Sequence, residues 1–254
     1  MTSFSWPGGK RIALSLSFDD ARPSQLDCGL PILDEHGVKA SFYVSLEPFN
    51  QRLDDWRAAA ENGHEIGNHT VSHPCSANYG SPIGGALEDF TIERMDGEMR
   101  QANAQIEKAI GLVPRTFAYP CGQKYVGRGA GLQSYVPLAA KHFLAARGFC
   151  DERPNDARRC DLAQLCGMDA DTDSFALLKT YLDYAYNSGG WLILAAHEVG
   201  PANYQTVEEN TLAELCRFAT DESNGVWIGT VAEIAGYLAA QRENSEFLTI
   251  DKHG

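Results

Sequence analysis

Short apolar segments alternate with longer amphipathic ones along the chain, and this alternation constrains the fold more than any other feature. The apolar segments predict β-strands at 11–18, 39–45, 65–68, 115–119, 191–196 and 226–228. Amphipathic spacing predicts helices at 26–36, 54–62, 91–110, 135–147, 174–186, 207–220 and 230–240. Strands that alternate with helices form parallel βα units, so the pattern predicts an α/β protein.

The length of 254 residues suits a single α/β barrel. A chain of this size buries roughly 70–75% of the surface that its unfolded form exposes, so it needs no covalent cross-link to fold. We expect the barrel to span residues 1–241 and a polar, peripheral tail to follow at 242–254.

The balance of charged residues limits the classes of partner. Lysine and arginine number 21, aspartate and glutamate number 34, and the net charge is −13. Nucleic acid selects basic faces, so no nucleic-acid partner is expected, and a polyanionic substrate is disfavoured. No run approaches the ~20 apolar residues of a membrane span, so no membrane association is expected.

Cysteine usage and the first residues indicate the compartment. The 7 cysteines are odd in number and form no CxxC pair, which predicts mostly reduced, buried thiols and disfavours a cysteine metal cluster. Residues 1–10 contain no apolar core of a signal peptide, so we expect a cytoplasmic protein, and a protein whose leader has been trimmed away is the alternative. The cysteines are Cys28, Cys75, Cys121, Cys150, Cys160, Cys166 and Cys216.

Polar residues of catalytic types follow the carboxyl ends of several predicted strands. Asp19 and Asp20 follow the first strand, His69 the third, Cys121 the fourth, and His197 the strand at 191–196. Barrel enzymes keep their active sites at this end of the strands. The shared position therefore indicates one active site built from distant parts of the chain.

The adjacent carboxylates Asp19 and Asp20 suit two different roles. Neighbouring residues at a strand end point in opposite directions, so one can bind a metal while the other faces the substrate. The alternative is a helix N-cap followed by an ordinary loop, although a cap needs only one carboxylate.

Three histidines complete the candidate set. His69 and His73 stand four residues apart, and with one carboxylate they can hold a divalent metal and leave positions open for water. Thr70 stands where a helical HExxH motif has glutamate, so we expect a turn, and a surface turn without metal is the alternative. His197 can give a proton to a leaving group, or it can simply satisfy hydrogen bonds of the core.

These segments resemble the motifs of the polysaccharide deacetylases, the NodB-homology domain or carbohydrate esterase family 4. Residues 17–21 (Ser-Phe-Asp-Asp-Ala) are similar to the first motif, Thr-Phe-Asp-Asp-Gly, and 69–73 match the second, His-Ser/Thr-x-x-His. Residues 115–122 resemble the third, Arg-x-Phe-Arg-x-Pro-Tyr-Gly, and 193–197 the fifth. The motifs occur in the family's order over most of the chain.

The resemblance implies a distorted (β/α) barrel of about seven strands with one divalent metal, zinc first and cobalt or nickel as alternatives. It implies Asp20, His69 and His73 as the metal ligands. It also implies Asp19 as the general base and His197 as the general acid.

The third and fifth motifs imply the residues that border the substrate: Tyr119, Pro120, Cys121 and Ala195. The backbone N–H of Cys121 is expected to hold the oxyanion together with the metal. Ala195 stands where the family usually has a leucine beside the acetyl methyl, which predicts a wider acyl pocket.

Two further departures from the family concern the groups that support the base and the acid. The family's second arginine in the third motif, which orients the base, is Ala118 here, so another group must tune Asp19. The fourth motif is not evident. Asp169 or Asp171 could support His197, and a solvated loop is the alternative reading of that segment.

We therefore expect a metal-dependent hydrolase that removes acetyl groups from an acetylated oligosaccharide or polysaccharide, with N-acetylamino sugars as the first candidate. An O-acetyl esterase of the acetylxylan type would use the same residues with an alcohol leaving group. A C–N hydrolase of a small cytosolic metabolite is a further alternative. A carbohydrate-binding barrel without catalysis is the alternative from another class.

Overall fold

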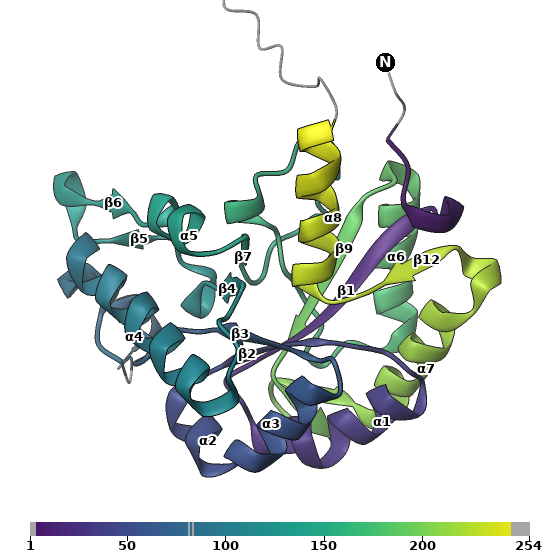
Figure 1. The fold of residues 1–254 in the computed structure, drawn as a ribbon, viewed down its shortest axis with the longest axis horizontal. Helices are drawn as coiled ribbons and strands as arrows, with labels where there is room; N and C mark the ends of the chain where they lie inside the picture. The colour runs from purple at the N-terminus through teal and green to yellow at the C-terminus, as the bar shows by residue number, and fades with distance from the viewer. Residues whose placement is uncertain (1–3, 81, 83, 245–254) are drawn as a thin grey trace, which may run out of the picture.

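The computed structural model describes residues 4–80, 82 and 84–244, and its centre is one curled parallel sheet (Figure 1). The sheet consists of β1 (Ile12–Asp19), β2 (Ser41–Val44), β3 (Glu65–Asn68), β4 (Thr116–Ala118), β7 (Ala145–Arg147), β8 (Met168–Asp169), β9 (Trp191–Ala196) and β12 (Val226–Ile228). The strand order is β7-β4-β3-β2-β1-β9-β8, and β12 pairs with the first half of β1. In Figure 1, β1 and β9 run side by side through the middle of the molecule.

The segment 165–169 links the two ends of this strand order. Leu165 forms a bridge to Arg147 at the end of β7, and β8 pairs with β9 a few residues later. The sheet therefore closes into a distorted barrel, which confirms the predicted fold class.

Helices cover the outside of the barrel. They are α1 (Leu30–Glu35), α2 (Leu46–Gln51), α3 (Leu53–Glu61), α4 (Ile92–Ile110), α5 (Val136–His142), α6 (Phe175–Ser188), α7 (Glu209–Thr220) and α8 (Val231–Asn244). The longest, α4, begins where the Thr91 side chain accepts a hydrogen bond from the N–H of Arg94. It ends at Gly111, whose φ of 75° is a left-handed cap, so this helix lies where the sequence predicts it.

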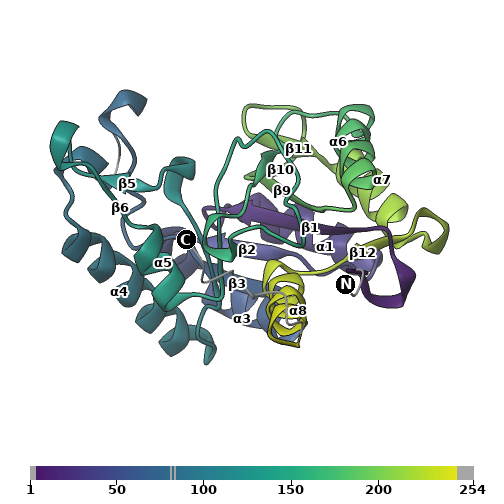
Figure 2. The same ribbon diagram turned by 90° about the horizontal axis from the view of Figure 1, so that it is seen from above.

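Two pairs of short strands and several single helical turns lie outside the main sheet. β5 (Tyr125–Val126) and β6 (Gln133–Ser134) form a hairpin, and β10 (Glu198–Gly200) pairs with β11 (Thr206–Glu208). Both views place the hairpin at the opposite end of the molecule from α6 and α7 (Figures 1 and 2). Single helical turns lie at Pro7–Gly9, Gln25–Gly29, Ala77–Tyr79, Leu87–Asp89, Pro120–Gly122, Gly129–Gly131, Leu162–Gln164 and Glu222–Asn224.

Strand β1 shows how the barrel separates apolar from polar groups. Leu14, Leu16 and Phe18 pack with the helices in the main hydrophobic core. The alternate residues, which include Ser17 and Asp19, face the barrel interior, as the two-residue period of a strand requires. The same alternation in β2, β3 and β4 fills the interior with polar side chains that hydrogen-bond one another.

The predicted helix at 135–147 is wrong in its second half. Helix α5 ends at His142, and Ala145–Arg147 forms β7 beside β4. The alanines favour a helix locally, but pairing with the exposed edge of β4 outweighs that preference because it closes the barrel. This correction matters for the site, because it places Arg147 at a strand end.

The last described helix passes the predicted boundary between barrel and tail. Helix α8 continues to Asn244, beyond the expected start of the tail at Arg242, and the rest of that tail lies outside the described residues. Among the residues that the structure describes, no helix combines the length and apolar character needed to span a membrane.

Candidate active site

The residues expected to carry the chemistry meet at the carboxyl ends of the strands. Asp19 is the last residue of β1, His69 follows β3 directly, and His197 follows β9 directly. Asp20 and Cys121 lie in the turns after β1 and β4. Parallel strands bring these ends to one mouth of the barrel.

Asp20, His69 and His73 form a compact set of possible metal ligands. The Oδ1 atom of Asp20 lies 3.5 Å from Nε2 of His73 and 3.8 Å from Nε2 of His69. One ligand atom from each of the three side chains lies within 4.8 Å of the other two. One carboxylate and two imidazoles with this spacing fit a divalent cation of the zinc type, and they leave coordination positions open.

His69 is prepared to act as a neutral ligand. Its Nδ1 lies 2.9 Å from the carbonyl oxygen of Ala118, so Nδ1 carries the proton and Nε2 presents its lone pair to Asp20 and His73. Burial lowers the pKa of His69 to about 4. The imidazole is therefore uncharged at neutral pH, as metal coordination requires.

Side-chain hydrogen bonds to the backbone fix the turn that carries both histidines. Asn68 accepts from the N–H of Thr70, and the Thr70 hydroxyl accepts from the N–H of His73. Glu98, from α4, accepts from the N–H groups of Val71 and Ser72 at 3.0 and 2.9 Å. Thr70 and His73 have positive φ values of 68° and 51°, so this network holds a strained backbone in the geometry that aims both rings at Asp20.

Two further side chains hold the Asp20 carboxylate in place. Its Oδ2 accepts a hydrogen bond from Arg22 at 2.9 Å, and Oδ1 accepts one from the Ser45 hydroxyl at 3.1 Å. Burial opposes the charged form, but His69, His73 and Arg22 hold the pKa of Asp20 well below its ordinary value. Asp20 is thus an ionised carboxylate, which suits a metal ligand.

Asp19 is oriented by Arg147, which sequence reasoning missed. Nη2 of Arg147 pairs with Oδ1 of Asp19, and both side chains are almost completely buried. The other oxygen, Oδ2, lies 3.9 Å from Nε2 of His69 and so faces the possible metal position. Burial alone would raise the pKa of Asp19, but Arg147, together with His69 and His197, holds the pKa below its ordinary value. Arg147 thereby supplies the charge that Ala118 lacks.

The barrel interior holds the Arg147 guanidinium in place. Its Nε donates to the Ser17 hydroxyl at 3.1 Å, and Nη1 donates to the carbonyl of Gly148 at 3.1 Å. The ring of Tyr43 lies 4.6 Å from the guanidinium carbon. Gly67 makes room for that ring, because a Cβ atom there would lie 2.5 Å from it.

His197 is paired with Asp171, one of the two aspartates left open by the sequence. Nδ1 of His197 lies 2.6 Å from Oδ2 of Asp171, whose Oδ1 accepts the backbone N–H of His197 at 3.0 Å. Burial by itself lowers the pKa of His197, but the bond to Asp171 and the charges of Asp19 and Asp20 raise it above its ordinary value. The pair leaves Nε2 on the far side of the ring from Asp171, where the side-chain nitrogen of Gln205 lies 3.5 Å from it.

Two further residues tie the acid and the base into the site. The Gln25 amide donates to the carbonyl oxygens of both Asp19 and His197, so it joins the ends of β1 and β9. The Phe149 ring packs edge-to-face on His197, with ring centroids 5.2 Å apart. Neither residue lies in a recognised motif, so neither could be predicted from the sequence.

Cys121 lies in a tight turn and forms a disulfide with Cys75, 46 residues earlier. The prediction of reduced thiols is therefore wrong for this pair, while the other cysteines are free. The turn uses the N–H groups of Gly122 and Gln123 in hydrogen bonds to Tyr119 and Pro120. The N–H of Cys121 itself stays a predicted oxyanion donor.

The other residues expected to border the substrate are enclosed. Tyr119 is fully buried, and its hydroxyl donates to the carbonyl of Ala163 at 2.7 Å. Pro120 is buried as well, and Ala195 is buried beside Ser17 in the sheet. Of these positions only Cys121 is partly exposed, so the wider acyl pocket at Ala195 stays a prediction.

The polysaccharide deacetylase family model matches residues 7–129, which include Asp19, Asp20, His69, His73 and Cys121. This part of the chain, nearly half of its length, is therefore similar to the polysaccharide deacetylases. Chitin deacetylase 1 of Cryptococcus neoformans is 28% identical over 107 residues, which are 42% of this chain and 20% of that protein. The chain spans between 10% and 26% of the length of the curated relatives that it matches.

Solved structures share the fold over nearly the whole chain. A Mycobacterium smegmatis protein assigned to the polysaccharide deacetylases superposes with a TM-score of 0.65 at 19% identity, covering 94% of both chains. A family 4 acetyl xylan esterase from Clostridium thermocellum, solved with a cobalt ion, gives a TM-score of 0.56 at 20% identity and covers 89% of this chain and 91% of its own. These likenesses establish the barrel fold.

Proposed function

We propose that the protein is a metal-dependent hydrolase that removes acetyl groups from N-acetylamino sugar residues of an oligosaccharide or polysaccharide. The observation that carries this proposal is the pairing of Asp19 with Arg147 and of His197 with Asp171 around one set of metal ligands. A base held ionised and an acid held protonated at one site are the requirement for amide hydrolysis.

The metal ligands in this proposal are Asp20, His69 and His73. A divalent cation held there supplies Lewis acidity toward the acetyl carbonyl and lowers the pKa of water. Zinc, cobalt and nickel all suit one carboxylate and two imidazoles.

Different residues around that position accept and donate the protons of the reaction. Oδ2 of Asp19 takes a proton from the attacking water, while Arg147 keeps Oδ1 in place. The N–H of Cys121 donates to the acetyl oxygen as that oxygen gains negative charge. Nε2 of His197 gives a proton to the departing nitrogen, and Asp171 stabilises the imidazolium beforehand.

The state of His197 favours an amine leaving group. An amine leaves only after it has been protonated, so it needs an acid that is charged near neutral pH, and the raised pKa of His197 meets that need. The similarity to a chitin deacetylase supports the same choice. The likeness to an acetyl xylan esterase makes O-acetyl ester hydrolysis the second candidate.

Acetate release separates these candidates. The substrates are N-acetylglucosamine oligomers and acetylated xylo-oligomers, each tested with the metal-replete protein, after chelation, and after addition of zinc or cobalt. We expect acetate from the N-acetyl oligomers, its loss on chelation and its return with metal. Faster release from xylo-oligomers would favour the esterase. Binding of both oligomers without any acetate would instead indicate a carbohydrate-binding barrel.

A further inference from the structure

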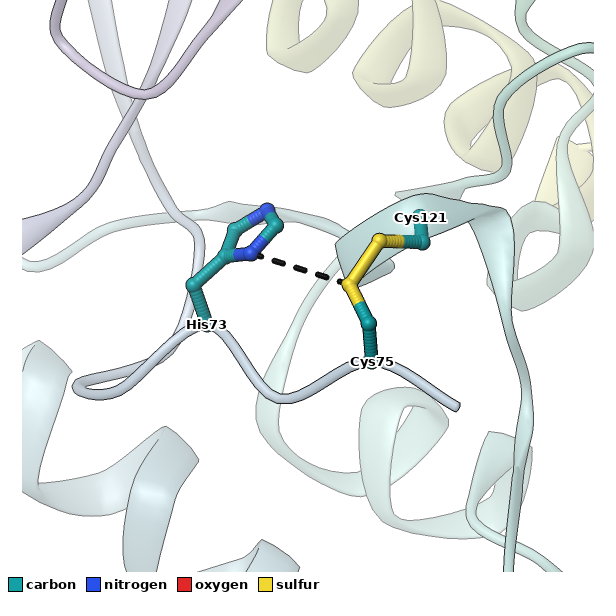
Figure 3. Close-up of side chains that lie close together, drawn as sticks. All are labelled: His73, Cys75 and Cys121. Atoms are coloured by element: carbon teal, nitrogen blue, oxygen red, sulfur yellow. Dashed lines mark hydrogen bonds between the residues drawn. A yellow bond between two sulfur atoms is a disulfide. The ribbon is translucent and has the colours of Figure 1, made fainter. Parts of the chain in front are cut away.

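His73 faces a different group with each of its ring nitrogens. Nε2 points toward Oδ1 of Asp20, 3.5 Å away. Nδ1 points toward Sγ of Cys75, 3.8 Å away (Figure 3). The metal site proposed above uses only the first of these nitrogens.

The Cys75–Cys121 disulfide places a second set of ligand atoms on the Nδ1 side. Nδ1 of His73 and the sulfurs of Cys75 and Cys121 lie within 4.8 Å of one another. Figure 3 shows the imidazole directed at the sulfur pair, with Cys75 on the same loop as His73 and Cys121 on the turn after β4. Two sulfurs and one imidazole nitrogen are typical ligands of zinc and of other soft or borderline cations.

We propose that the Cys75–Cys121 pair is redox-controlled, and that its reduced form creates with Nδ1 of His73 a second metal site, selective for thiolate-seeking cations. This inference does not depend on the proposed deacetylase activity. It also revises the expectation that the cysteines of this chain form no metal site.

The spacing needs little adjustment for such a site. In a tetrahedral zinc site, a thiolate sulfur and an imidazole nitrogen lie about 3.6 Å apart, as follows from the metal–ligand bond lengths. The distance between Cys75 and His73 is 3.8 Å already. Only the sulfur atoms have to separate, to roughly 3.8 Å, once the bond between them is broken.

Backbone hydrogen bonds keep the two cysteines close without the disulfide. The carbonyl of Cys75 accepts the N–H of Leu87 at 3.0 Å. The side chain of Gln123 accepts the N–H of Ser76 at 2.7 Å, which ties the segment after Cys75 to the turn after Cys121. These bonds survive reduction, so the two thiols stay neighbours.

The turn that carries Cys121 is also anchored independently. A Cβ atom added at Gly122 would lie 2.7 Å from the carbonyl oxygen of Phe149, so the turn packs tightly on that backbone. A cavity of about 320 Å³ lined by Ser76, Gly122 and Gln123 opens beside the two cysteines.

The reduction step is an ordinary exchange with a dithiol. The dithiol gives two electrons and two protons, the S–S bond of Cys75–Cys121 breaks, and the dithiol becomes a cyclic disulfide. On binding a cation, both cysteine thiols release their protons to solvent. No other oxidant or reductant is required.

Cobalt(II) tests the proposal, because thiolate ligation gives a charge-transfer band in the near ultraviolet that nitrogen and oxygen ligands do not give. The protein is titrated with cobalt in oxidised form and after reduction by a dithiol that is then removed. We expect the band only in the reduced protein, with the intensity of one thiolate-ligated cobalt per chain. Mass spectrometry after alkylation verifies the state of the pair.

Matched variants separate the two metal sites. Cys75→Ala should abolish the band, whereas Cys160→Ala, which removes a free thiol that packs with Leu162 and Tyr237 against a hydrophobic cluster in another part of the protein, should keep it. Asp20→Asn weakens only the first site, so it should keep the band. Circular dichroism checks that each variant is folded.

Two results would overturn the inference. Reduced protein without the band would show that the pair is a structural disulfide only. A band that persists in Cys75→Ala would place the cobalt on other thiols. Neither result bears on acetate release, so failure here and failure of the proposed deacetylase remain distinguishable.

Discussion

Arg147, the last residue of β7, pairs with Asp19, the last residue of β1, although 128 residues separate them in the chain. The register of the sheet places Arg147 directly beside Ala118, the position where the family has its base-orienting arginine. The arginine that pairs with Asp19 therefore lies on β7, next to the strand where the family motif has it, while Asp19 keeps its place on β1. The fold thus provides an arginine–aspartate ion pair although residues 115–122 lack the motif's second arginine.

Replacing Arg147 with methionine should disable the base. Without the guanidinium, burial dominates and raises the pKa of Asp19, so Asp19 takes up a proton at a higher pH than in the wild type. We expect turnover near neutral pH to fall by about 10²-fold or more, and the acid limb of the pH–rate profile to move to higher pH. The pH dependence of kcat measures both effects.

A second substitution tests whether an arginine on β4 can replace the one on β7. Ala118→Arg in the Arg147→Met background returns an arginine to the adjacent strand, so it should recover part of the lost turnover. Breaking a buried ion pair costs about 3–5 kcal/mol, so thermal unfolding must accompany the kinetics. An Arg147→Met enzyme that is folded and has an unchanged acid limb would contradict the role given to Arg147.

Asp171→Asn should move the alkaline limb of the same profile. Asp171 raises the pKa of His197, so its removal lets burial lower that pKa. The imidazolium then loses its proton at a lower pH, and activity that depends on it declines earlier as pH rises. Turnover at the optimum should fall by about 10²-fold or more.

Asp169→Asn is the matched control for this prediction. Asp169 lies two residues away and accepts the N–H of Asp171, a bond that asparagine can also accept. Its profile should keep the wild-type alkaline limb. If the two variants shift this limb equally, the pairing of His197 with Asp171 does not set the acid.

Glu98→Ala should weaken metal binding without touching a ligand. Glu98 accepts hydrogen bonds from the backbone of Val71 and Ser72, so its loss frees the turn between the two histidines. Removing such an outer contact typically costs 10–100-fold in metal affinity, and we expect about that effect. Competition with a chelator measures it. Glu107→Ala, exposed on the same helix, should bind metal as the wild type does.

The fold was largely predictable, and the reason lies in β1 and β9. Both strands are apolar runs at the centre of the sheet, and their carboxyl ends carry Asp19 and His197, so the sequence alone located one mouth of the barrel. Strand β7 was not predictable in this way. Its residues form a strand only because β4 offers an edge, which is a tertiary effect.

The supporting residues of the site were harder to predict than its central ones. Asp169 ends β8 and Asp171 lies in the loop that follows, and only the backbone path decides which of them meets His197. The Cys75–Cys121 disulfide joins distant segments, and spacing alone does not reveal such a pairing. Ala118 shows that another group has to orient Asp19, but it does not identify that group as Arg147.

The central claim is that Asp20 holds the metal and Asp19 acts as the base. Metal content and acetate release of Asp19→Asn, measured on one preparation beside the wild type, test it most directly. We expect a variant that keeps one metal per chain and loses about 10²–10⁴-fold in turnover, because it lacks the general base. A variant that loses its metal, or one that keeps its metal and full turnover, would show that Asp19 is not the base.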